Sequence, residues 1–354
     1  RLKKGRILMI RLNNDYCHGA IPEILEALQA TNSEAYAGYE LDEWCERAGA
    51  LIKEAAACPD AAVHYIVGGT QANVAIIAHA LRPWESVVCA DCGHINVHET
   101  GATEHIGHKC ETVPARDGKL AAADLRAVAQ GYAESPVPEH VTVPRMAYIS
   151  FPSESGTVYS LAELEALRAV CDEFGMYLFV DGARLAYGLA ASGNDVTLPD
   201  IARLSDAFYI GGTKCGALFG EAMVVVNSAL QPYFRNSMKQ AGTMLAKGWL
   251  LGLQFTKLFE GGRYFEIGKV AVAQAIRIKA ALAKRGLLAE PDSPTNQQFA
   301  LISDAQLASL SEACIVEFEG KGADNRNMVR FCTSWSTTDA EVDAVVAAIE
   351  GLPE

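Results

Sequence analysis

The stretch Tyr177-Leu-Phe-Val-Asp181 is an apolar run that ends in a carboxylate, and Gly182-Ala-Arg184 follows it directly. A second run, Phe208-Tyr-Ile-Gly-Gly212, leads into Thr213 and Lys214. Short apolar runs that contain aromatic and β-branched residues and are bounded by glycine are typical of buried strands. Ligands of open α/β sheets bind beyond the carboxyl ends of the strands, so we expect Asp181 and Lys214 to face one crevice.

Helical and strand-like patterns alternate on both sides of these two runs. Strands are expected at residues 63–67, 86–90, 145–150, 176–181 and 207–211, and helices at residues 22–30, 41–57, 71–81, 121–130 and 161–174. This alternation predicts an α/β fold in which a mainly parallel sheet carries helices on both faces.

The pattern changes near residue 250. Residues 243–259 and 263–285 predict two long helices, and they are followed by strands at 297–301, 314–318 and 328–332 and helices at 305–311 and 340–350. A chain of 354 residues is long enough for two domains of ordinary size. We therefore expect a large α/β domain over residues 1–250 and a small α+β domain over residues 251–354.

Composition and charge argue against several classes of partner. The chain has 30 Lys and Arg residues against 43 Asp and Glu residues, a net charge of −13, whereas nucleic-acid binding needs clustered positive charge. No apolar run reaches the roughly 18 residues of a transmembrane helix. The ten cysteines are scattered, which predicts reduced thiols in the cytoplasm. We expect a small-molecule substrate, and neither a nucleic acid nor a membrane as partner.

A glycine turn is the third candidate feature. Gly68-Gly69-Thr70-Gln71 follows the strand expected at residues 63–67 and opens a helix. Glycines let a ligand approach the backbone, and a helix N-terminus presents free N–H groups to a phosphate. A lysine, a carboxylate and a phosphate anchor are the three requirements of pyridoxal phosphate. Asp181 has two interpretations: it holds the protonated ring nitrogen of that cofactor, or it forms a structural pair with Arg184.

In order and in combination, several motifs resemble those of the threonine aldolases, in the beta-eliminating lyase group of fold type I pyridoxal-phosphate enzymes. They run from Asn14-Asp15 to Arg330 and include Gly69-Thr-Gln-Ala-Asn73, Gly93-His-Ile95 with Glu99, Val180-Asp-Gly-Ala-Arg184, Gly212-Thr-Lys214, Lys239-Gln-Ala-Gly242 and Val329-Arg-Phe-Cys-Thr333. The resemblance implies the aspartate aminotransferase-type fold of pyridoxal-phosphate-dependent transferases. It also implies a homodimer or homotetramer with sites at the subunit interface.

The resemblance implies catalytic roles for three residues. Lys214 would form the Schiff base with pyridoxal phosphate, and Asp181 would keep the ring nitrogen of the cofactor protonated. His94 would stack on the ring and take part in proton transfer. The reaction implied is the cleavage of L-threonine, L-allo-threonine or another β-hydroxy-α-amino acid to glycine and an aldehyde.

Binding roles follow from the same resemblance. Gly69, Thr70 and Gln71 would hold the phosphate group. Arg184, beside the cofactor, and Arg330 would bind the substrate carboxylate, because a planar guanidinium suits a target with two oxygens. In addition, Asn14 would form a hydrogen bond with a substrate oxygen.

One departure from the family concerns the base that removes the β-hydroxyl proton. Typical members carry a histidine after the strand expected at residues 145–150, where our alignment places Ser153. We take His94 as the first candidate for this base, because an ordinary histidine pKa near ~6.5 suits proton transfer at neutral pH. His98, Glu99 and a water molecule are the alternatives.

Three other interpretations stay open. Cys89, Cys92, His94 and His98 are ligand types at short spacing and suggest zinc, although strand alternation would separate the two cysteines, and we expect no metal. A β-eliminating lyase similar to tryptophanase or tyrosine phenol-lyase would keep the cofactor and change the reaction. A non-catalytic scaffold protein would keep only the fold.

Overall fold

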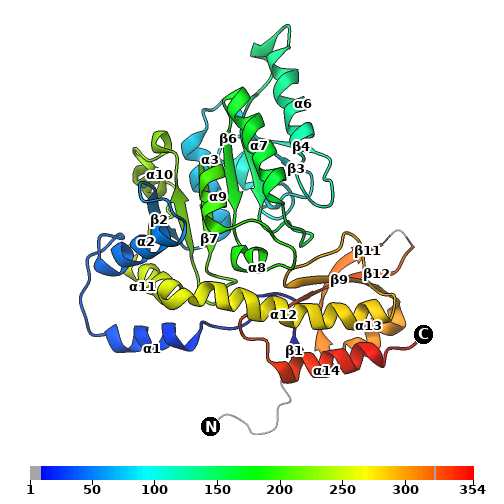
Figure 1. The fold of residues 1–354 in the computed structure, drawn as a ribbon. Coiled ribbons are helices and arrows are strands. Elements are labelled where there is room, and N and C mark those ends of the chain that lie inside the picture. The colour runs from blue at the N-terminus through cyan, green and yellow to red at the C-terminus, as the bar shows by residue number, and fades with distance from the viewer. Residues whose placement is uncertain (1–8, 323) are drawn as a thin grey trace.

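A seven-stranded sheet forms the centre of the computed structural model, which describes residues 9–322 and 324–354. Its strands are Ala62–Ile66 (β2), Glu85–Ala90 (β3), Lys109–Val113 (β4), Val143–Ser150 (β5), Tyr177–Asp181 (β6), Ala207–Gly211 (β7) and Glu221–Val225 (β8). Their spatial order is β2-β8-β7-β6-β5-β3-β4 (Figure 1). Neighbouring strands are parallel except where β8 pairs with β2 and β7. The predicted α/β fold with a mainly parallel sheet is confirmed.

The sequence pattern does not predict two of these strands, β4 and β8. β4 is an edge strand, and its Lys109, Glu111 and other polar side chains are exposed or half-buried. β8 is fully buried but reads Glu221-Ala-Met-Val-Val225, and its first three residues are better helix formers than strand formers. In both cases the pairing with a neighbouring strand outweighs the weak local preference.

Helices cover both faces of the large sheet. α3 (Gly69–Ala80) packs on one face, and α7 (Leu161–Phe174) and α9 (Leu198–Leu204) pack on the other. α7 has well-defined ends, because Ser160 and Glu163 form a capping box at its start and Gly175 closes it in the left-handed conformation. The other helices before residue 241 include α4 (His94–Val97), α5 (Ala102–His105), α6 (Ala122–Ala133), α8 (Leu185–Leu189) and α10 (Phe234–Gln240).

Successive side chains of the central strands enter two different hydrophobic cores. In β6, Phe179 packs in the core that contains α3, whereas Leu178 and Val180 pack in the core that contains α7. Since side chains alternate along a strand, Asp181 projects to the same face as Phe179. The same rule places Tyr148 of β5 and Tyr209 of β7 in the α3 core, so these three polar groups meet on one face of the sheet.

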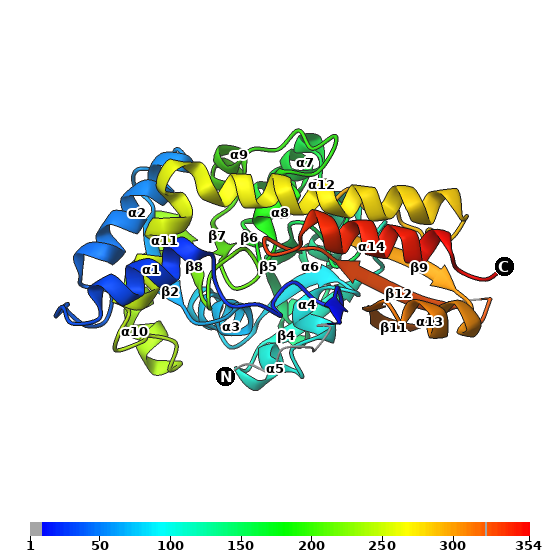
Figure 2. The same ribbon diagram turned by 90° about the horizontal axis from the view of Figure 1, so that it is seen from below.

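The C-terminal part of the chain builds a second, smaller layer. Its antiparallel sheet consists of Gln297–Ile302 (β9), Glu317–Lys321 (β11) and Asn327–Cys332 (β12) in the order β11-β12-β9. The long helix α12 (Arg263–Lys284) and α14 (Asp339–Glu350) lie side by side below it (Figure 2), and α13 (Asp304–Leu310) packs beside α14. Ile10–Arg11 (β1) pairs with Cys314–Ile315 (β10), so the N-terminal segment joins this layer. The predicted strand at residues 314–318 is thus two strands in different sheets.

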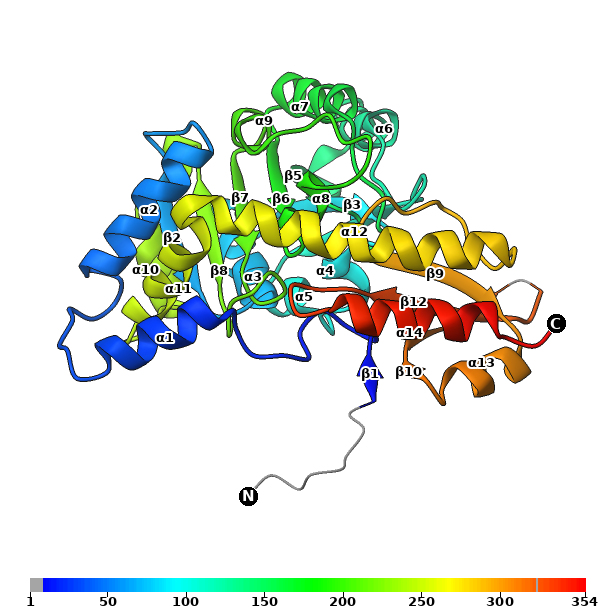
Figure 3. The same cartoon turned by 60° about the horizontal axis from the view of Figure 1, so that its bottom comes forward.

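Three helices pack together beside the large sheet, and one of them starts later than predicted. α11 (Trp249–Phe259) packs against α2 (Glu43–Ala55), and α1 (Pro22–Thr31) lies beside α11 (Figure 3). The helix predicted from residue 243 begins only at Trp249, after Gly242 has taken a left-handed φ of +71°.

The domain boundary near residue 250 stays a prediction. Leu251 and Phe255 of α11 are in the core that contains α7, and so is Ala271 of α12. Ile278 and Leu282, further along α12, are in the core of the C-terminal layer. This packing favours a boundary inside α12. In the part of the chain that the structure describes, no helix has both the length and the apolar character needed to cross a membrane.

Candidate active site

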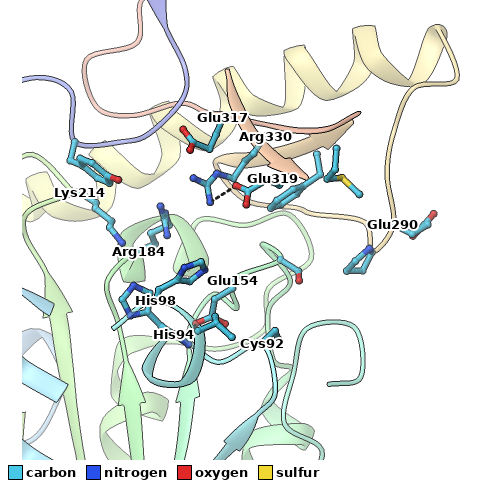
Figure 4. A pocket seen from close by; sticks show the side chains of 16 residues that line it. Cys92, His94, His98, Glu154, Arg184, Lys214, Glu290, Glu317, Glu319 and Arg330 are labelled. Atoms are coloured by element: carbon cyan, nitrogen blue, oxygen red, sulfur yellow. Dashed lines mark hydrogen bonds and ion pairs between the residues drawn. The ribbon is translucent and has the colours of Figure 1, made fainter. Parts of the chain in front are cut away.

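A cavity of about 640 Å³ opens between the carboxyl ends of the parallel strands and the C-terminal sheet. His94 and His98 follow β3, Glu154 follows β5, Arg184 follows β6 and Lys214 follows β7. Tyr16, Glu317, Glu319 and Arg330 close the opposite side. Figure 4 shows that Lys214, both histidines, Glu154 and the two arginines lie around the same space. The predicted crevice beyond the strand ends is therefore present.

Lys214 lies at the inner end of this cavity. Its removal from water and then the positive charge of Arg184 lower the pKa of the Lys214 amine. Its backbone carbonyl accepts a hydrogen bond from the Tyr187 hydroxyl at 2.5 Å, which fixes the loop after β7. A lysine with a lowered pKa keeps a larger neutral, nucleophilic fraction than a surface lysine.

Asp181, at the end of β6, is held by four hydrogen-bond donors. Its Oδ2 accepts from the Tyr148 hydroxyl at 2.6 Å and from Asn73 Nδ2 at 3.1 Å. Its Oδ1 accepts from the Tyr209 hydroxyl and from the Ala183 N–H group. These donors fix the carboxylate in one orientation, and Asp181 lines a small cavity of about 30 Å³ together with Lys214 and His94.

His94 belongs to the same polar network. Its Nδ1 lies 2.8 Å from Glu99 Oε1, and Asn73 Nδ2 donates to that same oxygen and to Asp181. Burial lowers the pKa of His94, but the hydrogen bond to Glu99 and the charge of Asp181 outweigh burial and raise it overall. The His98 ring lies 5.4 Å from the His94 ring, centroid to centroid. Burial, followed by the charge of His94, lowers the pKa of His98.

Arg184 pairs with Asp15 and not with Asp181. Arg184 Nε and Nη2 donate to the two oxygens of Asp15 at 2.6 and 3.0 Å, and Asn296 Nδ2 also donates to Asp15 at 3.0 Å. The structural Asp181–Arg184 pair considered from the sequence is therefore wrong. The physical reason is that Asp181 already has four donors on the α3 face, whereas the buried Asp15 needs a cation.

Arg330 reaches the cavity from β12. Its Nη1 lies 3.0 Å from Glu319 Oε1, an ion pair that Figure 4 shows above the histidines. Among the described residues, its Nη2 nitrogen has no hydrogen-bond or ion-pair partner. Because Arg330 lines the cavity, this nitrogen keeps donor capacity for a ligand.

The phosphate-turn residues and Asn14 lie outside the residues that line the two cavities. Gly69 is the first residue of α3, and a Cβ atom there would lie 2.9 Å from the Tyr209 hydroxyl that binds Asp181. Thr70 and Gln71 are exposed at the start of the same helix. The Asn14 Oδ1 atom accepts from the Tyr16 N–H group at 3.0 Å, so Tyr16 and not Asn14 faces the cavity.

Two acidic residues of the site are missed by the sequence reasoning, Glu154 and Glu221. Glu154 stands beside Ser153 in the loop that follows β5. A carboxylate shortly after a strand end is the sequence signal that could have identified it. Ser153 Oγ is instead within 2.7 Å of Thr157 Oγ1. Glu221 begins β8, a strand that the sequence pattern does not predict. Its oxygens accept from the Gly212 N–H group at 2.9 Å and from the Thr213 hydroxyl at 2.8 Å.

Replacing Glu221 with alanine is expected to destabilise the protein by about 2–4 kcal/mol, because two buried donors in the Lys214 loop lose their acceptor. Burial raises the pKa of Glu221 to about 8, so a neutral side chain suits the site. The control Glu221→Gln should therefore lower the free energy of unfolding by less than half as much as Glu221→Ala. Urea unfolding of the cofactor-free proteins measures both changes. Equal stabilities of the alanine variant and the wild type would contradict this assignment.

The structure does not bring the cysteine and histidine side chains together as one set of ligands among the described residues. Cys89 Sγ lies 3.3 Å from Cys110 Sγ on the neighbouring strand, and Cys92 Sγ contacts the Gly118 carbonyl. Within the described ranges, no three His, Cys, Asp or Glu side chains come together as metal ligands. The zinc interpretation of Cys89, Cys92, His94 and His98 thus has no support in the geometry.

Comparison with known proteins gives a consistent result. The family model of the beta-eliminating lyases matches residues 14–310. A solved structure of a Leishmania major threonine aldolase is 42% identical, with a TM-score of 0.93 over 96% of this chain and 98% of that chain. A low specificity L-threonine aldolase of Pseudomonas sp. (strain NCIMB 10558) is 28% identical over 96% of both chains.

A more distant structure shares the fold. A structure of SPT with pyridoxal phosphate is 14% identical, with a TM-score of 0.69 over 97% of this chain and 86% of that chain. The predicted fold type I architecture is confirmed. Because the family model covers most of the sequence and the threonine aldolase structure matches nearly all of it, this chain belongs to the beta-eliminating lyase family.

Proposed function

We propose that this protein is a pyridoxal-phosphate-dependent carbon–carbon lyase that cleaves L-threonine, L-allo-threonine and related β-hydroxy-α-amino acids to glycine and an aldehyde. The observation that carries the proposal is that Lys214, His94 and Arg184 line both cavities. Asp181 adds its carboxylate to the small cavity, and Arg330 adds its guanidinium group to the large one. The Leishmania major threonine aldolase, 42% identical over nearly the full length, supports this choice of reaction.

The residues present fit the cofactor. Lys214 is an amine of lowered pKa, suited to attach to the aldehyde carbon of pyridoxal phosphate. Asp181 is a rigidly held carboxylate on the α3 face, where the ring nitrogen would be bound. The start of α3 with Gly69, Thr70 and Gln71 offers the phosphate anchor. When bound, pyridoxal phosphate draws electrons from Cα of an amino acid and so allows the Cα–Cβ bond to break.

The remaining side chains would bind and orient the amino acid. Arg184, whose bidentate pair with Asp15 fixes the guanidinium group, and Arg330 would bind the substrate carboxylate. This contact would direct the Cα–Cβ bond, and His94, fixed through Nδ1 by Glu99, would lie against the cofactor ring. Glu319 also pairs with Arg330, so a bound substrate carboxylate would have to share or replace that ion pair.

Replacing Arg330 with lysine is expected to raise the KM for L-threonine by roughly 10–100-fold with a smaller change in kcat. Lysine keeps the positive charge but cannot form bidentate hydrogen bonds with the substrate carboxylate. Steady-state kinetics on the cofactor-loaded enzyme measure this. The matched control is Arg326→Lys, which changes a half-buried arginine of the same region that pairs with Asp324 and donates to the Leu301 carbonyl. An unchanged KM in the Arg330 variant would contradict the carboxylate-binding role.

The reaction is tested by identifying the products. The protein is loaded with pyridoxal phosphate and incubated with L-threonine or L-allo-threonine, and glycine, acetaldehyde, 2-oxobutanoate and ammonia are quantified. Glycine and acetaldehyde in equal amounts are expected. Formation of 2-oxobutanoate and ammonia would instead show β-elimination, as in the tryptophanase-like alternative. No product from a protein that binds the cofactor would favour the scaffold alternative.

We also propose a homodimer or homotetramer with active sites at the subunit interface, and a cytoplasmic location. The assembly is supported by the family assignment. The location is supported by the ten cysteines, all of which carry free thiols in the structure.

A further inference from the structure

We propose that Glu154 is the base that accepts the β-hydroxyl proton of the substrate. This inference rests on the proposed retro-aldol function and names the residue that such a reaction requires. The hydroxyl O–H bond breaks and its proton moves to Glu154, while the oxygen forms the C=O bond of the aldehyde. The Cα–Cβ bond breaks, its electron pair stays on Cα, and Cα then gains a proton, so no oxidant or reductant is consumed.

Glu154 is fixed through one oxygen only. Its Oε1 atom accepts the backbone N–H of His94 at 3.0 Å and the Ser150 hydroxyl at 2.6 Å. Its Oε2 atom has no hydrogen-bond partner in the described part of the chain and is not closed off from solvent. A carboxylate with one anchored and one free oxygen is a positioned acceptor, because the anchor sets the direction in which the free oxygen points.

The free oxygen belongs to a residue that lines both cavities. Glu154 shares the large cavity and the small one with His94, Arg184 and Lys214, and Figure 4 shows it beside His94 in the space below Arg330. Burial is the main reason why the pKa of Glu154 is raised above that of an ordinary glutamate. A raised pKa makes the ionised form a stronger base than a surface carboxylate.

The other candidates for this base are less suited. His94 has Nδ1 bound to Glu99 and is assigned to the cofactor ring. The His98 ring lies against the His94 ring, 5.4 Å from centroid to centroid, and among the described residues no hydrogen bond fixes the direction of its nitrogens. Ser153, where our alignment placed the family histidine, directs its hydroxyl to Thr157 and has no basic group. Glu99 is enclosed by His94 and Asn73 and does not line the cavity.

The variant Glu154→Gln removes the proton-accepting carboxylate but keeps the hydrogen bonds that position the side chain. The glutamine Oε1 atom still accepts the His94 N–H and Ser150 hydroxyl hydrogen bonds, whereas the amide cannot take a proton. We expect kcat for L-threonine cleavage to fall by about 100-fold or more, within the range known for general bases. The control Glu290→Gln makes the same chemical change at an exposed carboxylate near the cavity opening and should leave kcat within about twofold, as for ordinary surface substitutions.

A second readout does not involve the β-hydroxyl group. Glycine bound to the cofactor exchanges its α-proton with solvent, which proton NMR in deuterium oxide follows directly. If Glu154 is the base, Glu154→Gln keeps this exchange and the visible spectrum of bound cofactor close to wild type while cleavage is lost. A combined loss of exchange, cofactor absorbance and cleavage would show a structural role through His94 and would overturn the proposal.

Two further outcomes complete the test. Unchanged cleavage by Glu154→Gln, in a preparation where the wild type is active, would overturn the role of Glu154 and leave the proposed function intact. A wild-type protein that binds the cofactor and exchanges glycine protons but does not cleave L-threonine would overturn the proposed function, and the Glu154 proposal with it.

Discussion

Replacing Lys214 with alanine is expected to lower the rate of L-threonine cleavage by about 1,000-fold or more. The reason is that the variant lacks the amine to which the cofactor would be attached. Lys214 is the lysine that lines both cavities, and its amine has a lowered pKa because of burial and then the charge of Arg184. The variant should still fold, since in the described residues no hydrogen bond of the Lys214 amine contributes to the structure.

Two measurements check this expectation. Kinetic assays give the loss of kcat, and borohydride treatment followed by mass spectrometry shows whether the cofactor is attached to the peptide that contains Lys214. Lys269→Ala is the matched control, because this lysine is exposed on α12 and pairs with Glu266 on its own helix. Cofactor attached to another lysine, or a Lys214 variant of normal activity, would contradict the assignment.

Replacing Asp181 with asparagine is expected to lower kcat by about 100–1,000-fold and to weaken cofactor binding. Asparagine cannot balance a positive charge on the ring nitrogen, so the ring becomes a weaker electron acceptor. Its amide group would also face the hydroxyl donors Tyr148 and Tyr209 and the Asn73 amide. Some loss of stability is therefore expected as well.

Fluorescence titration with pyridoxal phosphate and thermal melting separate these two effects. A variant that melts near the wild-type temperature but binds the cofactor weakly supports contact between Asp181 and the ring. The control Tyr148→Phe removes one donor and keeps the charge, so it should reduce activity much less. Normal cofactor affinity and normal kcat in Asp181→Asn would show that this carboxylate is only structural.

Local patterns predict much of the fold because the buried strands are short, apolar and bounded by glycine. β6 and β7 end at the residues expected from the sequence, and the alternation of their side chains assigns Asp181 to the face that also carries Tyr209. The missed strands have weak local signals. β4 is a polar edge strand, and β8 begins with residues that favour helices, so only pairing with neighbours defines them.

The candidate site is predicted less completely, because several partners come from distant parts of the chain. The sequence indicates Asp181 and Lys214 through their positions at strand ends, and His94 through the family resemblance. It does not indicate that Asp15, far away in the sequence, is the partner of Arg184. Nor does it distinguish Ser153 from its neighbour Glu154, since the direction of each side chain depends on the loop conformation.

The attachment of pyridoxal phosphate to Lys214 is best tested by the visible absorbance spectrum of the purified protein, recorded before and after glycine is added. We expect a yellow protein whose absorbance band shifts when glycine is added, and we expect Lys214→Ala to lose this response. A colourless protein that takes up no added pyridoxal phosphate would refute the proposed function, because the assignments of Lys214, Asp181 and Glu154 all depend on that cofactor.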